Sequence, residues 1–248
     1  MPLAIYVKAP PKTKSTKPIV GKKTERFFFA VISAVGIFSI FFATWPMLVW
    51  QLKTLPKLTA GVNLQPIPQA QVLSSKTILD QSVQVIQDPD GFSYFTTDYK
   101  PPAATQSGPV SRPQEFTLTI PKLDIQKAKV KVDSTRFDIS LSHFPGTALP
   151  GEIGNSFITG HSVLPQFADP QNYKTIFTKL ADLEIGDDVY IQINDQNLHF
   201  MVQYAKIVSP RDTSVLLPIS ATGRNLTLMT CVPPGTSTKR LVVITSLL

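Results

Sequence analysis

The chain has 248 residues, of which 43% are hydrophobic, and a formal net charge of +7. Residues 1–26 hold +6 of this charge, and the rest of the chain is close to neutral. This distribution argues against a basic nucleic-acid-binding face on the folded part, because such a face needs clustered cations. The length allows one or two domains, and the single cysteine, Cys231, excludes an internal disulfide.

Residues 27–52 form an apolar stretch of 26 residues without a charged side chain. About 20 helical residues cross a bilayer core, so this stretch predicts a single transmembrane helix. Trp45 and Trp50 lie near its C-terminal end, where aromatic rings favour the membrane interface. The basic cluster before it predicts a cytoplasmic N-terminus and an extracytoplasmic body. A cleaved signal peptide is the alternative, but its apolar region usually spans only about 7–15 residues.

Between residues 53 and 115 the composition changes, and prolines recur among Gln, Ser and Thr. Such a segment buries little surface and predicts an extracytoplasmic linker. Residues 83–95 are more apolar, and the preferred interpretation is a strand or turn packed on the domain edge. The expected organisation is a basic cytoplasmic tail, a membrane anchor, a linker and a folded domain, at residues 1–26, 27–52, 53–115 and 116–248.

The folded part contains short apolar or alternating runs separated by turn signals, a pattern typical of β-strands. The expected strands are residues 116–120, 128–132, 156–160, 189–193, 198–207, 226–230 and 241–245. Residues 194–197 predict the turn of a hairpin, and apolar side chains at helical spacing predict a helix over residues 172–183. Short strands at this density indicate an all-β fold, either an antiparallel sandwich or a closed barrel.

The segment from Leu226 to Val243 carries the strongest chemical signal. Cys231 ends one apolar run, and Arg240 opens the next on the far side of a loop containing Pro-Pro-Gly. Two such runs predict adjacent antiparallel strands, which place the thiol and the guanidinium opposite each other. A positive charge beside a thiol favours the thiolate and can stabilise an oxyanion, so Cys231 is a candidate nucleophile. A buried cysteine acting as a small hydrophobe is the alternative.

Three histidines are candidates for the base that serves this thiol. His161 directly follows an expected strand and a glycine, a position at a barrel rim, and is preferred. His143 lies in a loop and is expected at the surface or in a turn. His199 lies within a strand and is expected to point outward or to make one hydrogen bond. The sequence therefore predicts Cys231 as the nucleophile, His161 as the general base and acid, and Arg240 as the positive group.

Metal chemistry is a weaker interpretation. One cysteine and three scattered histidines give no ligand pair at zinc-site spacing, so no metal and no cofactor is expected. The acidic stretch Asp182–Asp188 could bind a cation such as calcium, although stretches of this kind are more often solvated turns. The sequence contains no internal repeat and no phosphate-cradling glycine loop.

The residues Thr227-Leu-Met-Thr-Cys231, followed by Arg240-Leu-Val-Val, resemble the Cys/Arg signature of the sortases. Residues 155–161, Asn-Ser-Phe-Ile-Thr-Gly-His, are similar to the segment that delivers the sortase histidine. Residues 119–125 and 144–155 also resemble family segments, in the family order. The resemblance covers about residues 116–248 and implies a closed eight-stranded β-barrel with one or two short helices.

This resemblance implies a membrane-anchored cysteine transpeptidase. Cys231 would attack a backbone carbonyl in a C-terminal sorting motif of a secreted protein, of the Leu-Pro-x-Thr-Gly kind. The thioacyl intermediate would then pass to an amine on a cell-wall precursor or a pilin subunit. His161 would protonate the leaving amine and deprotonate the incoming one, and Arg240 would hold the substrate carbonyl or oxyanion. Further substrate contacts are implied for Thr230, Ser162 and the backbone N–H of Val232.

The sortase class stays open, although the short loop at residues 233–236 resembles the short-loop classes. Some pilin-building sortases carry a lid with an Asp-Pro-aromatic motif in the active site. Here residues 88–92 read Asp-Pro-Asp-Gly-Phe, which departs from that motif. Pairing of Asp88 with Arg240 in a closed state is a hypothesis.

Rival interpretations fit the sequence less well. In a papain-like protease the cysteine precedes its histidine, whereas His161 precedes Cys231 here. The Ser-His-Gly-Cys type of motif of an L,D-transpeptidase is absent. The alternative from another class is a non-catalytic, membrane-tethered β-domain that binds glycan or protein and buries Cys231.

Overall fold

The computed structural model describes residues 22–60, 84–87, 93–96, 112–136 and 138–248. Two compact units make up the chain, residues 1–44 and residues 45–248. Helix α1, Lys22–Ala60, contains the span Arg26–Lys53, which is long and apolar enough to cross a membrane and has a mean hydropathy of 2.3. Among the described residues this is the single helix of that kind, as the sequence predicts.

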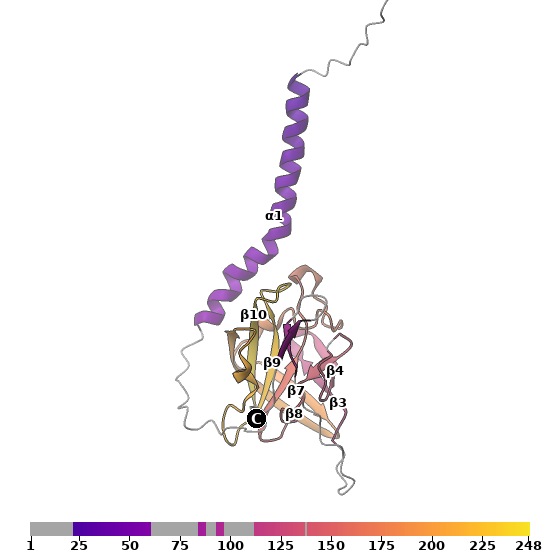
Figure 1. Cartoon of the computed structure of the whole chain (residues 1–248), viewed down its shortest axis with the longest axis vertical. Helices are drawn as coiled ribbons and strands as arrows, with labels where there is room; N and C mark the ends of the chain where they lie inside the picture. The colour runs from indigo at the N-terminus through magenta and orange to yellow at the C-terminus, as the bar shows by residue number, and fades with distance from the viewer. Residues whose placement is uncertain (1–21, 61–83, 88–92, 97–111, 137) are drawn as a thin grey trace, which may run out of the picture. The chain divides into compact units, whose positions relative to one another are not determined.

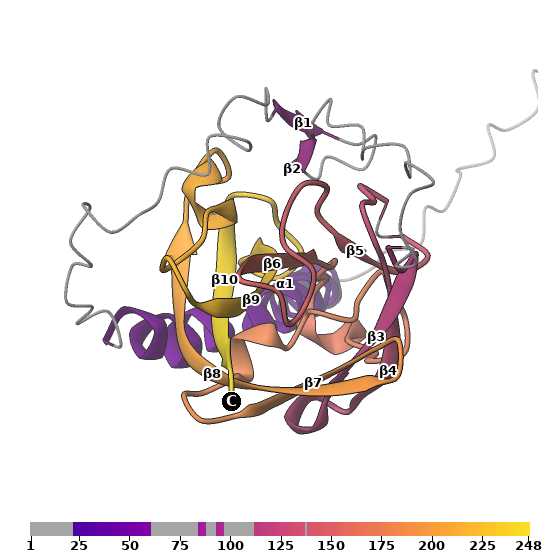
Figure 2. The ribbon, with the colours of Figure 1, turned by 90° about the horizontal axis from the view of Figure 1, so that it is seen from below.

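Eight strands close into a barrel in the order β10-β8-β7-β3-β4-β5-β6-β9 (Figure 1). Figure 2 shows the strands following one another around the ring. Their bounds are β3 Glu115–Ile120, β4 Ile125–Lys131, β5 Leu141–His143, β6 Gly154–Thr159, β7 Asp188–Ile193, β8 Gln196–Val208, β9 Arg224–Val232 and β10 Lys239–Leu247. The pairs β4–β5 and β6–β9 are parallel, and the other neighbours are antiparallel. The predicted closed eight-stranded barrel is confirmed.

Short 3-10 helices lie in the connections between the strands. Their bounds are η2 Pro121–Leu123, η3 Pro165–Phe167, η4 Leu180–Asp182 and η5 Thr213–Leu216. The connection from β7 to β8 is the predicted hairpin, in which Ile193 pairs with Gln196. Asn194, the first residue of the two-residue turn, has φ of 50°, a left-handed conformation that asparagine tolerates in tight hairpin turns.

The barrel interior is filled by every second residue of the strands, as the alternating sequence pattern predicts. In β3 and β7 the buried members are Phe116, Leu118, Ile120, Val189, Ile191 and Ile193. Strand β9 differs, because residues 226–232 are buried on both faces. Leu226, Leu228 and Val232 belong to the interior cluster, whereas Met229 belongs to a second cluster with Val242 and Ile244 of β10. Other segments therefore cover the outward face of β9 and β10.

One of those segments is a hairpin that precedes the barrel in the chain. Strands β1, Gln84–Gln87, and β2, Ser93–Thr96, pair antiparallel in a separate two-stranded sheet. Phe95 of β2 is only 4% exposed, and its ring centroid lies 6.3 Å from those of Phe144 and Phe157. The expected strand packed on the domain edge is thus confirmed.

The prediction of a helix over residues 172–183 is wrong. The segment forms consecutive turns that end in η4, with backbone bonds such as Thr175 N to Asn172 O and Thr178 N to Thr175 O. The hydroxyls of Thr175 and Thr178 also donate to the carbonyls three residues earlier, which competes with helical bonding. The apolar residues Ile176, Phe177 and Leu180 are buried, so the spacing indicated burial correctly.

The surface position expected for His143 is also wrong. His143 ends the three-residue strand β5 and is fully buried. Its Nε2 lies 2.9 Å from the carbonyl of Ala148 and 3.1 Å from the hydroxyl of Thr147. These two partners satisfy Nε2, whereas Nδ1 has no hydrogen bond among the described residues and lies 3.7 Å from Asp133 Oδ1.

Candidate active site

Cys231 and Arg240 are directly opposed in the antiparallel pair β9–β10. The loop between them returns the chain after Val232, and Thr236 N closes it with a hydrogen bond to Pro233 O. Paired residues on antiparallel strands point to the same face of the sheet, so the thiol and the guanidinium share the outward face of the barrel. The predicted placement of these two residues across the loop is confirmed.

The Arg240 side chain is held rigidly. It is 1% exposed, and its Nη1 donates to the carbonyls of Ser237 and Lys239 at 2.9 and 3.0 Å. Burial lowers the pKa of Arg240 below its ordinary value, and the nearby Cys231 opposes that change. Guanidinium has so high an ordinary pKa that the group stays cationic. A fixed cation therefore lies beside Cys231, which is 9% exposed and is the least buried residue of the run 226–232.

His161 follows the end of β6, the parallel neighbour of β9. The residues on both sides of it are bonded to β9. Gly160 N donates to Met229 O, and Thr230 Oγ1 donates to Gly160 O at 2.9 Å. Ser162 Oγ donates to the carbonyl of Cys231 at 2.7 Å. These bonds place His161 next to the C-terminal end of β9, where Cys231 lies.

Gly160 is required by packing at this point. A Cβ on Gly160 would lie 2.6 Å from Cδ2 of Phe177 and 2.7 Å from Cδ2 of Leu141, closer than real side chains allow. The turn after β6 thus fits against the interior only with glycine. Phe177 N also donates to the carbonyl of His161, which fixes the backbone on the other side of the imidazole.

The outward face of β6, β9, β10 and β8 forms a continuous surface, which we call the floor. Strand register divides it into three rows, spaced by two residues or about 6.6 Å along the strands. The first row is Cys231, Arg240 and Val208; the second is Thr159, Met229, Val242 and Lys206; the third is Phe157, Thr227, Ile244 and Tyr204.

Two walls rise from the floor at its third row. The segment around η5 is held by Asn155, which donates to the carbonyl of Val215 at 3.0 Å and accepts from the hydroxyl of Thr227 at 2.7 Å. Phe95 of the hairpin packs on Phe157, which is also in the third row. These contacts cover part of the floor, and Phe157 and Thr227 are at most 1% exposed.

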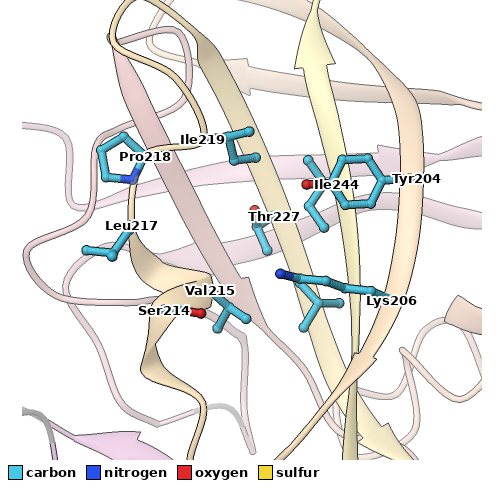
Figure 3. Close-up of a pocket in the computed structure, with 10 residues that line it drawn as sticks. Tyr204, Lys206, Ser214, Val215, Leu217, Pro218, Ile219, Thr227 and Ile244 are labelled. Carbon is cyan, nitrogen blue, oxygen red and sulfur yellow. The ribbon is translucent and has the colours of Figure 1, made fainter. Parts of the chain in front are cut away.

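A pocket of about 220 Å³ opens on the floor beneath the segment around η5 (Figure 3). Its walls are mainly apolar and include Val215, Leu217, Ile219, Val242 and Ile244. Lys206 and Tyr204 enter it from β8. The sequence analysis did not identify these two residues. They face the floor because β8 has a bulge opposite Ile244 and Thr245, which reverses the faces of the residues that follow.

Three residues were expected from the resemblance to contact substrate. The hydroxyls of Thr230 and Ser162 are both used in bonds to the backbone, and both side chains are buried. Val232 is buried, and its carbonyl accepts from Thr238 Oγ1 at 3.3 Å. The hypothesis that Asp88 pairs with Arg240 falls on a residue outside the described part of the chain.

The other polar candidates lie elsewhere. His199 bonds to Asp188 at 2.7 Å and stacks on Tyr190 with a centroid distance of 4.7 Å. In the acidic stretch, the ammonium of Lys122 contacts Glu184 and Asp187 at 2.9 and 2.8 Å and offsets part of their negative charge. Within the described ranges no group of three or more His, Cys, Asp or Glu residues is arranged to hold a metal ion.

Fold and site together define a closed β-barrel protein with a cysteine and an arginine opposed on the outward face of two neighbouring strands. The sortase domain model matches residues 118–248, more than half of the chain, and the chain therefore belongs to the sortase family. Sortases are cysteine transpeptidases, so membership supports a transpeptidase function for this chain.

Solved structures similar to the chain include three sortases. The sortase A lid mutant from Corynebacterium diphtheriae is 29% identical, with a TM-score of 0.47, over 56% of this chain and 72% of that one. A pilus-related sortase C of Group B Streptococcus is 30% identical, with a TM-score of 0.47, over 54% and 67%. A sortase D transpeptidase of Clostridium perfringens is 25% identical, with a TM-score of 0.46, over 54% and 79%. A search of curated protein sequences found no match.

Proposed function

We propose that this chain is a membrane-anchored transpeptidase that cleaves a C-terminal sorting motif of secreted proteins and transfers the acyl part to an amine. The acceptor amine belongs to a cell-wall precursor or a pilin subunit. The observation that carries the proposal is the direct opposition of Cys231 and Arg240 in β9–β10, with His161 fixed beside the same strand end. Family membership supplies the reaction class.

In the first half of the reaction, the Cys231 sulfur attacks the carbonyl carbon of the scissile peptide bond. The carbonyl oxygen becomes an oxyanion, which the Arg240 guanidinium and the backbone N–H of Val232 stabilise. The carbon–nitrogen bond then breaks, and His161 gives a proton to the leaving amine. The product of this half is a thioester between Cys231 and the N-terminal part of the substrate.

In the second half an incoming amine attacks the thioester carbon and loses a proton to His161. The carbon–sulfur bond breaks, and Cys231 leaves as a thiolate beside the cation of Arg240. Each half exchanges one acyl bond for another, so no oxidant, metal or nucleotide is required. The hydroxyls of Ser162 and Thr230 contribute by holding the two strand ends together.

We infer that a peptide substrate lies extended on the floor, along a groove that begins at the pocket and leads to Cys231. An extended chain advances about 3.3 Å per residue, so the pocket between the second and third rows lies two to four residues before the scissile carbonyl. The first residue of a Leu-Pro-x-Thr-Gly motif is three residues before the threonine whose carbonyl is attacked. The apolar walls formed by Val242, Ile244 and Val215 suit an aliphatic side chain at that position.

The proposed location follows from the helix and the charge pattern. The apolar span of α1 anchors the chain, and the basic residues 1–26 stay on the cytoplasmic side. Residues 53–115 connect the anchor to the catalytic domain, residues 116–248, on the outer side. Both substrates, an anchored secreted protein and a wall precursor or pilin, would be reached from the membrane surface.

The test uses the full chain in detergent micelles and its Cys231→Ala variant. Each is mixed with a pooled library of Leu-Pro-x-Thr-Gly peptides and with triglycine, and intact masses are recorded. We expect an acyl adduct on the wild-type protein and triglycine-capped peptide, and neither with the variant. Cys231 is the only cysteine, so the adduct site is unambiguous.

The control variant is Ser140→Ala, because Ser140 is buried and its hydroxyl has no hydrogen-bond partner among the described residues. This variant should keep the wild-type turnover. Peptide binding without any adduct or product, in both the wild type and Cys231→Ala, would contradict the transpeptidase proposal and favour a binding domain.

A further inference from the structure

Lys206 introduces a positive charge into an otherwise uncharged, mainly apolar pocket. The ten residues that line the pocket all lie in the described part of the chain, and Lys206 is the one charged member. Figure 3 shows its side chain extending from β8 across the floor toward Thr227 and Val215. Within the described residues its ammonium has neither a hydrogen bond nor an ion pair. A cation in this position can be neutralised by a ligand.

The register places this cation close to the reaction path. Lys206 is in the second row of the floor, paired with Val242, and Arg240 is in the first row. The two cations are therefore one row apart, which is about 6.6 Å along the strands. A peptide that runs from the pocket to Cys231 passes over both. No carboxylate of the protein is among the pocket-lining residues, all of which are described.

The pocket also offers a second polar group beside the lysine. Tyr204 lies in the third row, opposite Ile244, and lines the same pocket. Burial raises the pKa of Tyr204 above its ordinary value, so its phenol stays protonated and can donate a hydrogen bond. An ammonium and a phenol beside apolar side chains suit a ligand side chain with an aliphatic stem and a terminal carboxylate.

We propose that Lys206 is a specificity-determining residue that selects substrates with a carboxylate side chain two to four residues before the residue whose carbonyl is attacked. The inference rests on the proposed transpeptidase function and adds the charge of the substrate to it. The stem of the acidic side chain packs on Val242 and Ile244. Its carboxylate forms an ion pair with the ammonium of Lys206 and accepts a hydrogen bond from the hydroxyl of Tyr204. An amide of the same shape keeps the packing and loses the ion pair.

The test compares three pairs of peptides based on Leu-Pro-x-Thr-Gly, each pair differing only by Glu or Gln. The exchanged position is the residue directly before the motif, the first residue of the motif or its second residue, which lie four, three and two residues before the threonine whose carbonyl is attacked. The full chain in detergent micelles is assayed with triglycine, and the ratio of kcat/KM for Glu over Gln is measured. We expect one pair to favour Glu about fivefold, in the range of a partly desolvated ion pair.

Substitutions of Lys206 separate charge from packing. Lys206→Met keeps an unbranched apolar stem and should bring the favoured ratio to about one, and Lys206→Glu should reverse it. The control is Lys131→Met, which removes the same charge from the exposed face of β4 and should leave the ratio unchanged. Ratios near one for all three pairs in the wild type, or a ratio that survives in Lys206→Met, would overturn the inference.

A binding measurement keeps the two proposals distinguishable. The same fluorescently labelled peptides are titrated into the Cys231→Ala full chain, and the Glu/Gln ratio of Kd is measured with and without Lys206→Met. A wild-type protein that turns over no peptide while its Cys231→Ala form discriminates through Lys206 would contradict the proposed function alone. Turnover without discrimination would contradict the role of Lys206 alone.

Discussion

The hydroxyl of Ser162 donates a hydrogen bond of 2.7 Å to the backbone carbonyl of Cys231. The two residues are 69 positions apart in sequence, and the bond joins the turn after β6 to the end of β9. The residue that follows the candidate base is thus tied directly to the backbone of the candidate nucleophile. A bond in this place can control the position of the imidazole without touching substrate.

Replacement of Ser162 by alanine should therefore reduce both stability and turnover. The buried carbonyl of Cys231 loses its side-chain donor, which costs about 1–3 kcal/mol in the free energy of unfolding. We expect kcat to fall about tenfold with little change in KM, because the reacting groups are misplaced and the groove is intact. Denaturant unfolding and peptide kinetics measure the two effects, with Ser140→Ala as the control. An unchanged kcat would show that the bond has no positioning role.

Arg240→Lys should remove most of the activity although it keeps the charge. The guanidinium is held by two carbonyls, those of Ser237 and Lys239, and lysine cannot reproduce this fixed planar fork. Loss of one oxyanion donor typically costs about 10²–10³ in kcat. Single-turnover kinetics should show slow formation of the thioester on Cys231. Wild-type acylation by the lysine variant would argue that any cation suffices.

Gly160→Ala tests the packing that sets the turn before His161. The new Cβ would collide with Phe177 and Leu141, at 2.6 and 2.7 Å. Overpacking of this kind costs about 1–3 kcal/mol in the free energy of unfolding. We expect a lower unfolding midpoint and a lower kcat, because the backbone of His161 must shift. Gly36→Ala, where nothing lies within 4 Å of the added carbon, is the glycine control and should be neutral.

Phe95→Ala tests the hairpin as a wall of the groove. Without the ring, β2 loses its contacts with Phe144 and Phe157. We expect the hairpin to detach, with faster hydrogen exchange in residues 93–96, and KM for peptides to rise about threefold or more, as the groove loses apolar contact. Phe95→Leu should keep most of both properties. A fall in KM would show instead that the hairpin obstructs the groove.

The ion pairs of Lys122 predict a pH dependence of stability. Hydrogen bonds to Asp187 and then Glu184 raise the pKa of Lys122 above its ordinary value of 10.5. The folded state therefore binds this proton more tightly than the unfolded chain does, and the stabilisation is complete below pH 10.5. It is lost as the pH rises through the raised folded-state pKa. The stability difference between the wild type and Lys122→Met should thus be constant from about pH 7 to 9 and shrink above that range. A constant difference through pH 11 would contradict this assignment.

Much of the fold follows from patterns that the sequence displays. Alternation located the long strands, and the Cys231–Arg240 spacing predicted their opposition across a loop. Strand β5 escaped prediction, because three residues buried on both faces show no alternation. For the same reason His143 was expected at the surface. Apolar spacing in residues 172–183 suited either a helix or packed turns, and the structure has packed turns.

The pocket could not be predicted from the sequence. Along β8, Phe200 and Val202 point into the barrel, and strict alternation would place Lys206 there too. An unpaired ammonium in an apolar interior is energetically costly. The bulge after Val202 turns Tyr204 and Lys206 to the floor instead. The sequence did contain one indication of the bulge, namely a lysine at a position of a long strand that alternation assigns to the interior. The wall made by Asn155 and Val215 joins residues 60 positions apart, which local patterns do not encode.

Strand β10 pairs with both β8 and β9 and follows every other barrel strand in the chain. Until it is inserted, β8 and β9 each have an unpaired edge, the barrel is open, and Cys231 has no guanidinium opposite it. Closure of the barrel and assembly of the reactive centre are consequently the same event. A chain that lacks β10 therefore carries Cys231 without the cation that the folded barrel places opposite it.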